Sequence, residues 1–347
     1  MSCQPLADFD LQPYNSFGLA ARARWGCEIT ELDGLQRLLS EPKWRELPRL
    51  VIGGGSNLLL SCDFAGLVLL NRLKGIEVTE TADAWYLQVA AGEDWPALVA
   101  WSLQQGMPGL ENLALIPGCA GAAPVQNIGA YGVELAQVCE HVDAFNLLTG
   151  QLERLPAEAC RFGYRESRFK GDWQHSHIIT GIGLRLNKHW QPHCQYGPLA
   201  ALSQPSAQDI YERICQLRQA KLPDPAVLGN AGSFFKNPTV PQALAAALKA
   251  EYPNMPLYPA DNGAAKLAAG WLIEQAGLKG YRLGRAAVHQ EQALVLVNLG
   301  GATAEELLQL ARHVRQTVHA RFGLWLEHEV RIMGAMGEWK EALSCAD

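Results

Sequence analysis

The segment Arg49-Leu50-Val51-Ile52-Gly53-Gly54-Gly55-Ser56-Asn57 joins a short apolar run to three consecutive glycines. Residues 49–52 have the length and the apolar character of a buried strand, so we expect a strand that leads directly into the glycine loop. Successive N–H groups of such a loop can point at a pyrophosphate. The loop lacks the Gly-Lys-Ser/Thr sequence of a P-loop and the spacing of a Rossmann fingerprint, and a plain glycine turn explains it equally well.

Residues 116–132 form a second, longer segment of this kind, with the sequence IPGCAGAAPVQNIGAYG. It follows a predicted strand at 85–91 and a predicted helix that begins after Gly92-Glu93-Asp94 and ends before Gly106. Small side chains pack poorly as a core but well against a flat ligand; an extended Ω-type loop is the alternative. Two such loops in an alternating α/β region suggest a dinucleotide held mainly by backbone groups.

Composition restricts the classes of function. The chain has 347 residues, 48% apolar and 18% charged, which is enough for two or three domains of an ordinary globular protein. The net charge of -6 and the lack of a Lys/Arg-rich run argue against a nucleic-acid partner. The N-terminus lacks the features of a signal peptide and no apolar run reaches the ~20 residues of a membrane span, so we expect a cytoplasmic protein.

Cysteine usage predicts reduced thiols. The nine cysteines are scattered singly without a Cys-x-x-Cys pair, which favours neither a zinc site nor a disulfide framework. We expect no metal site, because no cluster of His, Asp, Glu and Cys has the spacing of metal ligands. Cys119 stands inside the second glycine loop, where a small filler is favoured over a reactive thiol.

Residues 161–170 place five charged side chains among Phe162, Tyr164 and Phe169. A solvated loop explains the charges, but the aromatic side chains should bury and draw a guanidinium inward, where its fork suits a carboxylate or an enolate. A helix that begins after Ser206 should reach about Arg218 and end at the Pro-rich residues 221–225, which form the main predicted domain boundary.

Two segments near the C-terminus carry candidate polar groups. Residues 229–238 set Ser233 among glycines; an edge strand entering a turn explains the local pattern, and close approach by a ligand is the alternative. Residues 324–332 predict a strand that carries Glu327, Glu329 and Arg331 on one face, which a surface ladder of charges also explains. Between them the sequence predicts helices at 241–250, 264–276 and 303–323 and a strand at 293–298.

From residues 14–18 to 327–331 the chain resembles the UDP-N-acetylenolpyruvoylglucosamine reductase (MurB) family in its longer, type I form. The motifs that carry the resemblance occur in order at 53–57, 116–132, 161–167, 221–225 and 230–238. The resemblance implies an α+β fold, with an FAD-binding part of two subdomains like that of p-cresol methylhydroxylase (PCMH) and vanillyl-alcohol oxidase, and a C-terminal α/β substrate-binding domain. The implied division is 1–73 joined by 324–347, then 74–222, then 223–323.

The resemblance also implies FAD as the cofactor. We expect it to be bound noncovalently, because the first histidine, His141, follows both glycine loops. Ala122 and Ala123 replace hydroxyl residues of some relatives, which puts side-chain contacts there in doubt. The residues implied to bind FAD are Gly53, Gly54, Gly55, Ser56, Asn57, Leu58, Gly118, Ala122, Gln126, Asn127, Ile128, Gly129 and Arg331.

The implied reaction is the reduction of UDP-N-acetylglucosamine enolpyruvate to UDP-N-acetylmuramate by NADPH in peptidoglycan precursor synthesis. Hydride would pass from flavin N5 to C3, Ser233 would give a proton to C2, and Arg165 and Glu329 would stabilise the enolate. The residues implied to bind the substrate are Tyr131, Tyr196, Lys221, Asn237, Tyr258, Lys279 and Gln292. We expect a monomer with small-molecule partners only; a flavoprotein oxidase of the same fold and an inactive UDP-sugar sensor are the alternatives.

Overall fold

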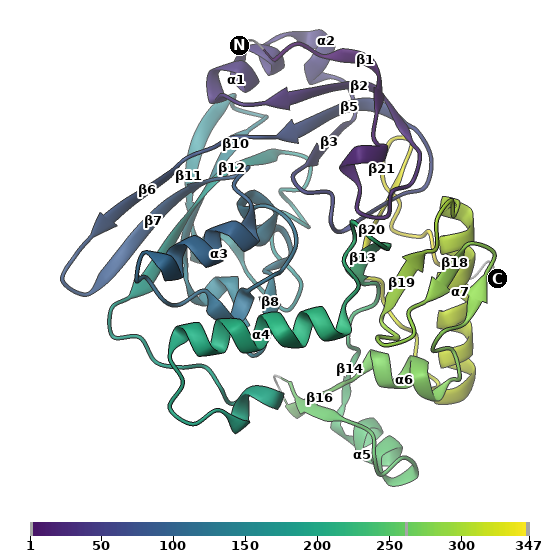
Figure 1. Ribbon diagram of the computed structural model, residues 1–347. Helices are drawn as coiled ribbons and strands as arrows, with labels where there is room; N and C mark the ends of the chain where they lie inside the picture. The colour runs from purple at the N-terminus through teal and green to yellow at the C-terminus, as the bar shows by residue number, and fades with distance from the viewer. Residues whose placement is uncertain (1–2, 261–262, 345–347) are drawn as a thin grey trace. The chain divides into compact units, whose positions relative to one another are not determined.

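The computed structural model describes residues 3–260 and 263–344. The chain forms two compact units, each assembled from separate parts of the sequence (Figure 1). The first unit comprises the residues up to Phe9, Ala23–Gly55 and Ala65–Ala220, and the second comprises Asp10–Arg22, Ser56–Phe64 and the residues from Lys221 on.

A small four-stranded sheet opens the first unit, with the strand order β1-β2-β5-β3. Its strands are β1 (Leu6–Asp10), β2 (Arg22–Ile29), β5 (Phe64–Asn71) and β3 (Arg49–Ile52), and α1 (Leu32–Ser40) and α2 (Pro42–Arg45) lie between β2 and β3 in the sequence. β3 pairs in parallel with β5, which confirms the strand predicted at 49–52. The buried face of α1 contributes Leu35, Leu38 and Leu39 to a core shared with this sheet.

One cysteine prediction is wrong. Cys3 and Cys27 form a disulfide in the structure, so the thiols are not all free. Their Cα atoms are 6.1 Å apart, within the range that a disulfide requires. The two cysteines are 24 positions apart in the sequence, a separation that carries no local signal of pairing.

A five-stranded antiparallel sheet forms the larger part of the first unit, in the order β11-β10-β12-β7-β6. Its strands are β6 (Ile76–Glu80), β7 (Ala84–Ala90), β10 (Cys139–Asn146), β11 (Gln151–Pro156) and β12 (His177–Asn187). The helices α3 (Trp95–Gln104) and α4 (Ala207–Lys221) share its hydrophobic core. The predicted strand at 85–91 and both predicted helices are confirmed, and α4 extends three residues beyond the predicted Arg218.

Short elements fill the long connections of this unit. They are the 3-10 helices η2 (Glu111–Leu113), η3 (Ala120–Gln126), η4 (Leu135–Gln137), η5 (Ala157–Cys160) and η6 (Gly197–Ala201), and the two-residue strands β8 (Gly129–Ala130) and β9 (Val133–Glu134). The second glycine loop therefore contains one 3-10 helix and the first strand of a tight hairpin.

The second unit contains an antiparallel sheet in the order β13-β19-β18-β17. These strands are β13 (Gly229–Ser233), β19 (Val295–Asn298), β18 (Ala286–Val288) and β17 (Arg282–Leu283), and the apolar stripe of α7 (Ala304–Phe322) shares their core. Thr303 and Glu306 form the predicted capping box, and Gly323 ends α7 at φ 68°. The position of β13 at the edge of this sheet confirms the edge strand predicted around Ser233.

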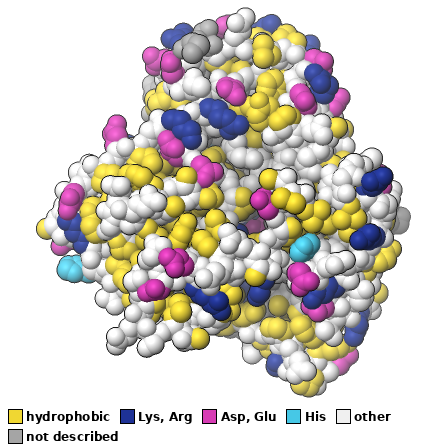
Figure 2. Space-filling model, in the orientation of Figure 1, with side chains coloured by type: hydrophobic (Ala, Val, Ile, Leu, Met, Phe, Trp, Pro, Cys, Tyr) yellow, Lys and Arg dark blue, Asp and Glu magenta, His cyan; other side chains and the backbone are white. Residues whose placement is uncertain are grey.

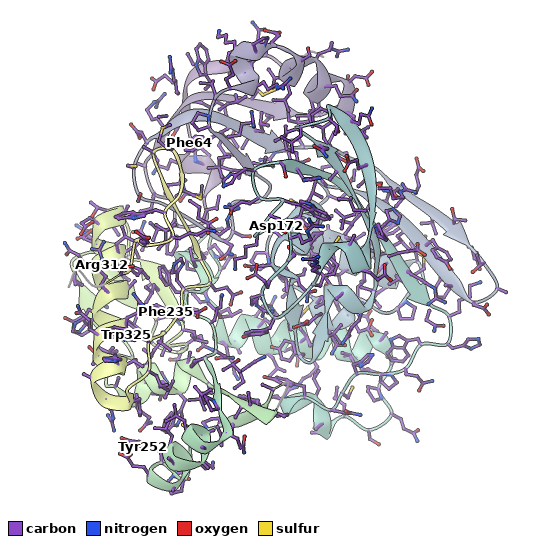
Figure 3. All side chains as sticks on the ribbon, turned by 180° about the vertical axis from the view of Figure 1, so that it is seen from behind. Phe64, Asp172, Phe235, Tyr252, Arg312 and Trp325 are labelled. Carbon is purple, nitrogen blue, oxygen red and sulfur yellow. A yellow bond between two sulfur atoms is a disulfide. The ribbon has the colours of Figure 1, made fainter. Side chains whose placement is uncertain are left out.

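Two further sheets complete the second unit. One has the order β14-β16-β15, with β14 (Thr239–Pro241), β16 (Ala264–Leu267) and β15 (Leu257–Pro259); α5 (Gln242–Glu251) and α6 (Ala269–Gln275) follow β14 and β16. The other joins β21 (Gly337–Glu338) and β20 (Arg331–Gly334) to β4 (Leu58–Leu60), and a 3-10 helix, η1 (Gln12–Tyr14), lies near the start of the unit. Phe235, Tyr252 and Trp325 of this unit are among the side chains labelled in Figure 3.

Two predicted elements differ from the structure. The predicted helix at 264–276 begins only at Ala269, because residues 264–267 form the central strand β16 between two partners. The predicted strand at 324–332 becomes regular only from Arg331; before it, an isolated bridge joins Phe235 to His328. The predicted alternation survives, since Leu324, Leu326 and Val330 are buried.

Surface charge, helix hydropathy and metal-ligating side chains can be compared with the sequence predictions. On the face shown in Figure 2, Lys and Arg side chains are interspersed with Asp and Glu. Within residues 3–260 and 263–344, no helix is both long enough and apolar enough to cross a membrane. In the same part of the chain, no group of three or more His, Cys, Asp or Glu side chains could hold a metal ion.

Candidate functional site

The two glycine loops of the first unit lie against each other. A Cβ on Gly54 would stand 3.0 Å from Cα of Gly118, and a Cβ on Gly53 would collide with Sγ of Cys119. Gly55 and Gly118 have φ values of 63° and 127°, which favour glycine. The close packing of the two loops therefore favours glycine here, while Gly54 remains exposed to solvent.

Backbone hydrogen bonds hold the second loop against the start of α3 and the end of β7. The N–H of Trp95 donates to the carbonyl of Gly118 at 3.0 Å, and the N–H of Gly121 donates to the carbonyl of Ala91 at 2.8 Å. Cys119 is 7% exposed, and burial raises the pKa of its thiol. A protonated, buried thiol agrees with the small filler favoured by the sequence. Ala122 is exposed on this loop.

The side chain of Asn127 is occupied by protein partners. Its amide nitrogen donates to Oε2 of Glu134 at 2.8 Å and to the carbonyl of Gly163 at 3.1 Å, and its oxygen accepts the N–H of Ala136 at 2.9 Å. Asn127 is 1% exposed and has a φ of 44°. An FAD contact at this position would therefore use the backbone. Glu134 was not identified from the sequence, where no local pattern links it to Asn127.

Arg165 lies beside the second glycine loop. Its Nη2 donates to the carbonyl of Gly129 at 2.9 Å, and Lys170 Nζ donates to the carbonyl of Arg165 at 3.1 Å. The hydroxyl of Ser167, which is 3% exposed, donates to the carbonyl of Val125 at 2.7 Å. Arg165 has a φ of 55°, in the left-handed region, and this strained backbone is held by contacts on both sides. The predicted guanidinium is thus drawn inward, as its aromatic neighbours suggested.

Tyr131 and Tyr196 are the other predicted residues that the first unit brings together. Their rings meet edge to face with centroids 6.5 Å apart. Tyr196 is 42% exposed, while Tyr131 is half-buried and its carbonyl accepts the side-chain amide of Asn112 at 3.1 Å. Burial raises the pKa of Tyr131, so its hydroxyl remains a hydrogen-bond donor at neutral pH.

In the second unit, Ser233 ends β13 directly after a break in the strand register. β13 pairs with β19 at Asn230 and again at Ser233, with a shift of register between these residues. Gly232 has a φ of 69°, and its N–H donates to Oδ1 of Asn230 at 2.9 Å. The amide nitrogen of Asn230, a residue that is 2% exposed, donates to the carbonyls of Pro223 at 3.1 Å and Leu228 at 2.8 Å. One buried side chain therefore shapes the bulge that carries Ser233.

The segment that contains Glu329 runs alongside the residues after Ser233. The N–H of Glu329 donates to the carbonyl of Phe234 at 2.8 Å, and the N–H of Lys236 donates to the carbonyl of Glu327 at 2.8 Å. The Glu327 side chain is 76% exposed and pairs with Lys236 at 3.1 Å, whereas Glu329 is half-buried. This difference favours Glu329 over Glu327 as the functional carboxylate.

Arg331 and Asn57 connect the terminal strand to β4. Arg331 pairs with Leu58 in the parallel ladder of β20 and β4, and its N–H donates to the carbonyl of Asn57 at 3.1 Å. The Asn57 amide donates to the carbonyl of Glu329 at 3.3 Å. Nε of Arg331 pairs with Glu338 at 2.9 Å, and the side chain of Glu338 is only 8% exposed. Glu338 lies in the C-terminal tail, where the sequence pattern gave no signal.

The remaining predicted substrate residues of the second unit are more dispersed. Oδ1 of Asn237 accepts the N–H of Ala269 at 2.9 Å. A Cβ on Gly270 would stand 3.0 Å from Oε1 of Gln292. The side chains of Asn237 and Gln292 therefore flank the first turn of α6. Lys279 pairs with Glu274 at 3.1 Å, beyond the last turn of α6. Tyr258 is opposite Lys266 in the β15–β16 ladder, and Lys221 is an exposed residue at the end of α4.

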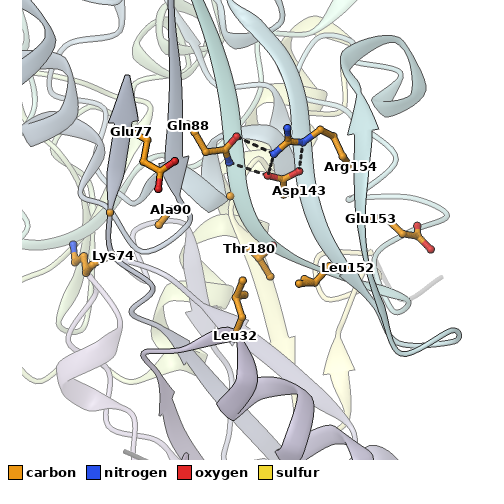
Figure 4. Close-up of a pocket in the computed structure, with 12 residues that line it drawn as sticks. Leu32, Lys74, Glu77, Gln88, Ala90, Asp143, Leu152, Glu153, Arg154 and Thr180 are labelled. Atoms are coloured by element: carbon orange, nitrogen blue, oxygen red, sulfur yellow. Dashed lines mark hydrogen bonds and ion pairs between the residues drawn. The ribbon is translucent and has the colours of Figure 1, made fainter. Parts of the chain in front are cut away.

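A groove of about 430 Å³ on the large sheet of the first unit contains none of the predicted site residues (Figure 4). Its polar groups bond one another: Gln88 on β7 donates to Asp143 on β10 across β12 at 2.8 Å, and Arg154 on the adjacent strand β11 pairs with Asp143 at 2.8 Å. A Cβ on Gly181 would stand 3.1 Å from the Gln88 amide nitrogen, so glycine leaves room for this bridge. These polar groups already have partners within the groove, and we do not place the functional site there.

The structure thus gathers two separate sets of predicted residues. In the first unit the two glycine loops, Arg165, Tyr131 and Tyr196 have direct contacts with one another or with residues of the second loop. In the second unit Asn57, Leu58 and Arg331 join the segment of Glu329, which runs beside the segment of Ser233. The individual roles of these residues stay predictions.

The exposed, closely packed glycine loops suit FAD, whose pyrophosphate is commonly held by backbone N–H groups. A family model described as an FAD binding domain matches residues 27–155. A second family model, described as the C-terminal domain of UDP-N-acetylenolpyruvoylglucosamine reductase, matches residues 224–333. The chain therefore contains an FAD-binding domain in an α+β fold.

Curated relatives match nearly the whole chain. The UDP-N-acetylenolpyruvoylglucosamine reductase of Photobacterium profundum is 51% identical over 335 residues, covering 96% of this chain and 97% of the relative. That of Pasteurella multocida is 52% identical over 331 residues, covering 95% and 97%. A crystal structure of the MurB reductase from Thermus caldophilus is 26% identical, with a TM-score of 0.66 and coverage of 96% of this chain and 99% of that one. The chain thus belongs to the UDP-N-acetylenolpyruvoylglucosamine reductase (MurB) family of oxidoreductases.

Proposed function

We propose that the chain reduces UDP-N-acetylglucosamine enolpyruvate to UDP-N-acetylmuramate with FAD and NADPH, as a step of peptidoglycan precursor synthesis. The observation that carries the proposal is the 51% identity to the Photobacterium profundum reductase over 96% of the chain. We further propose that FAD is bound noncovalently and that the protein works as a cytoplasmic monomer. The three-part division at 73–74, 222–223 and 323–324 is part of the same proposal.

When bound, FAD would supply the redox chemistry, which is the transfer of hydride from NADPH by way of N5 to C3 of the enolpyruvyl group. Ser233 donates the proton that C2 requires. Because a serine hydroxyl is a weak acid, this role depends on close placement, which the adjacent Gly232 and the bulge support. Arg165 and Glu329 bind the enolpyruvyl carboxylate and stabilise the charge that develops beside it.

Backbone groups carry most of the proposed FAD binding. Gly53 and Gly54 support this because a Cβ at either position would crowd the second loop, and Gly55 and Gly118 because their φ values favour glycine. Residues with side chains take part as well, with Arg331 oriented by Glu338. The full proposed set adds Ser56, Asn57, Leu58, Ala122, Gln126, Asn127, Ile128 and Gly129.

The proposed substrate contacts serve the uridine diphosphate and the sugar. Lys221, Lys279 and Asn237 suit the diphosphate, which a chain with a net charge of -6 could not attract by its overall field. Tyr196 is exposed enough to close over a ligand. The set also includes Tyr131, Tyr258 and Gln292.

The decisive experiment follows the flavin through both half-reactions. NADPH should bleach the yellow purified protein, and the enolpyruvyl substrate should restore the colour faster than air does. Faster reoxidation by oxygen would identify a flavoprotein oxidase instead. A protein that binds the UDP-sugar without turnover would be the sensor, and either result would refute the proposal.

A further inference from the structure

Glu134 lies in a tight hairpin, directly opposite Gly129. β8 and β9 pair antiparallel, with Gly129 and Glu134 as partners in the register. Tyr131 and Gly132 connect the two strands, and their φ values of 50° and 84° have the positive sign that both central residues of a type I′ turn require. A two-residue turn of this kind fixes the register, so the Glu134 side chain lies on the same face of the hairpin as the open position at Gly129.

A carboxylate and a guanidinium share the space above Gly129. A Cβ on Gly129 would stand 2.9 Å from Cγ of Glu134 and 3.3 Å from Nη1 of Arg165. Nη2 of Arg165 donates to the carbonyl of Gly129 at 2.9 Å. Glycine therefore leaves the space in which Arg165 reaches the hairpin, with Glu134 beside it.

Glu134 also fixes the side chain of Asn127. Oε2 of Glu134 accepts one amide N–H of Asn127 at 2.8 Å, and the carbonyl of Gly163 accepts the other at 3.1 Å. Because an ionised carboxylate only accepts hydrogen bonds, the amide turns its nitrogen toward Glu134, and this orientation presents the second N–H to Gly163. The N–H of Ala136, which donates to Oδ1 at 2.9 Å, imposes the same orientation from the other side.

The turn that carries Arg165 begins at Gly163. Gly163 and Glu166 exchange backbone hydrogen bonds at 3.0 and 3.2 Å, and Arg165 lies between them. The Asn127 amide therefore holds the base of this turn. Glu134 acts on the turn twice, through Asn127 at its base and beside the guanidinium of Arg165.

We propose that Glu134 is a positioning residue that aims the Arg165 guanidinium at the enolpyruvyl carboxylate. This inference rests on the proposed function, in which Arg165 binds that carboxylate. A guanidinium fork pairs with two carboxylate oxygens only when its plane has the correct orientation. Glu134 supplies this constraint by holding Asn127, and through it the turn, in one arrangement.

Three substitutions of Glu134 test the proposal. The readout is the affinity of the FAD-loaded protein for the enolpyruvyl substrate, measured by titration calorimetry without NADPH. Glu134→Ala should weaken binding at least about tenfold, the scale of a lost hydrogen bond to a charged group. Glu134→Gln keeps an oxygen that can accept the Asn127 amide, so its affinity should stay within about threefold of the wild type. Glu134→Asp keeps the charge but withdraws the acceptor, and it should behave like Glu134→Ala.

The direction of the change separates positioning from a purely electrostatic role. Removing a negative charge near an anion site favours binding of the anion, so both Glu134→Ala and Glu134→Gln would tighten binding if Glu134 acted by its charge alone. Tighter binding, or unchanged affinity in Glu134→Ala, would overturn the inference. Equal losses in Glu134→Ala and Glu134→Gln would also overturn it. Normal turnover of the wild type would leave the proposed function intact in each case.

Arg165→Gln separates positioning from packing. If Glu134 acts through Arg165, adding Glu134→Ala to Arg165→Gln should change the affinity less than about twofold, because the group that Glu134 positions is already gone. If the two losses add, Glu134 acts independently of Arg165, as a structural residue would, and the inference fails. UDP, which lacks the carboxylate, should bind Glu134→Ala and the wild type within about twofold of each other. An equal loss for UDP and for the substrate would likewise overturn the inference.

Glu140→Ala is the matched control. Glu140 is an exposed carboxylate of β10 in the same unit, and its removal changes the net charge by the same amount. We expect less than about a twofold change in affinity for the substrate, because an exposed charge contributes little. A wild-type protein that binds neither the substrate nor UDP would refute the proposed function together with the inference.

Discussion

Replacing Asn230 by alanine tests whether one buried side chain shapes the backbone before Ser233. The Asn230 amide donates to the carbonyls of Pro223 and Leu228 and accepts the N–H of Gly232, and the residue is 2% exposed. Alanine removes all three hydrogen bonds and has no polar side-chain group that could replace them. The N–H of Asn230, which donates to the carbonyl of Ser16 at 3.0 Å, is unaffected by the change.

The expected loss follows from these three bonds. Each net hydrogen bond contributes about 0.5–1.5 kcal/mol, so the free energy of unfolding should fall by about 1.5–4.5 kcal/mol. Asn254→Ala is the control, because Asn254 is exposed in the same unit and should change stability by less than about 0.5 kcal/mol.

Urea unfolding of both variants, with the FAD content matched, measures the difference. Because a chain with two units need not unfold in one step, hydrogen exchange of the β13 amides should be measured as well, since it reports local opening directly. Faster exchange in β13 and an unchanged rate in α3 would agree with a local role. A loss below about 1 kcal/mol, or one equal to that of Asn254→Ala, would refute the proposed support of the bulge.

Three further predictions concern single side chains. Ser233→Ala should leave flavin reduction by NADPH within about twofold while slowing reoxidation by the substrate at least about 100-fold, and stopped-flow traces with equal losses in both steps would contradict its role as the acid. Glu329→Gln should slow reoxidation in the same assay, whereas Glu327→Gln, which removes only a surface pair with Lys236, should change it less than about twofold. Burial raises the pKa of Cys139 from 9.0 to about 12, so the buried protonated thiol stabilises the fold below pH 9, and this stabilisation should be lost as the pH rises towards 12. The free energy of unfolding, measured in urea at several pH values, should therefore fall less steeply with pH in Cys139→Ala than in the wild type. Parallel curves for the two proteins would contradict this prediction.

Local signals explain most of the elements that could be predicted. The strand at 49–52 is a short apolar run ended by glycines, and α7 has a capping box at one end and Gly323 at the other. Each of these signals lies within a few residues of the element that it defines. The error at 264–267 has the opposite origin, because those residues are a strand only through their pairing with β14 and β15.

The candidate site shows the same difference between residues that have a local sequence signal and residues that depend on distant contacts. Motifs identified Arg165 and Ser233, but not the groups that hold their segments in place. Glu134 reaches Asn127 across a hairpin, and Glu338 reaches Arg331 across another. Such contacts depend on how the chain turns between the partners, which neither charge nor spacing in the sequence reveals.

Glycine content alone does not establish a ligand site in this chain. Gly53 and Gly54 are needed because Cys119 and Gly118 lie directly against them, so close packing explains these glycines without any cofactor. Gly54 is nevertheless exposed, so its backbone is open to a ligand. The exposed backbone of Gly54 and the FAD-binding domain match at 27–155 together support a nucleotide ligand.

The residue type alone does not establish the role of Ser233, the proposed acid, either. A serine hydroxyl gives up its proton reluctantly, so the chain can contribute only its position and the exclusion of water. The residues that follow Ser233 contribute to its position: Phe234 and Phe235 are 0% and 1% exposed, and the carbonyl of Phe234 accepts the N–H of Glu329 at 2.8 Å. Position is therefore fixed by Asn230 on one side of Ser233 and by this bond on the other. A substitution that relaxes either support should slow proton transfer even though the hydroxyl itself remains.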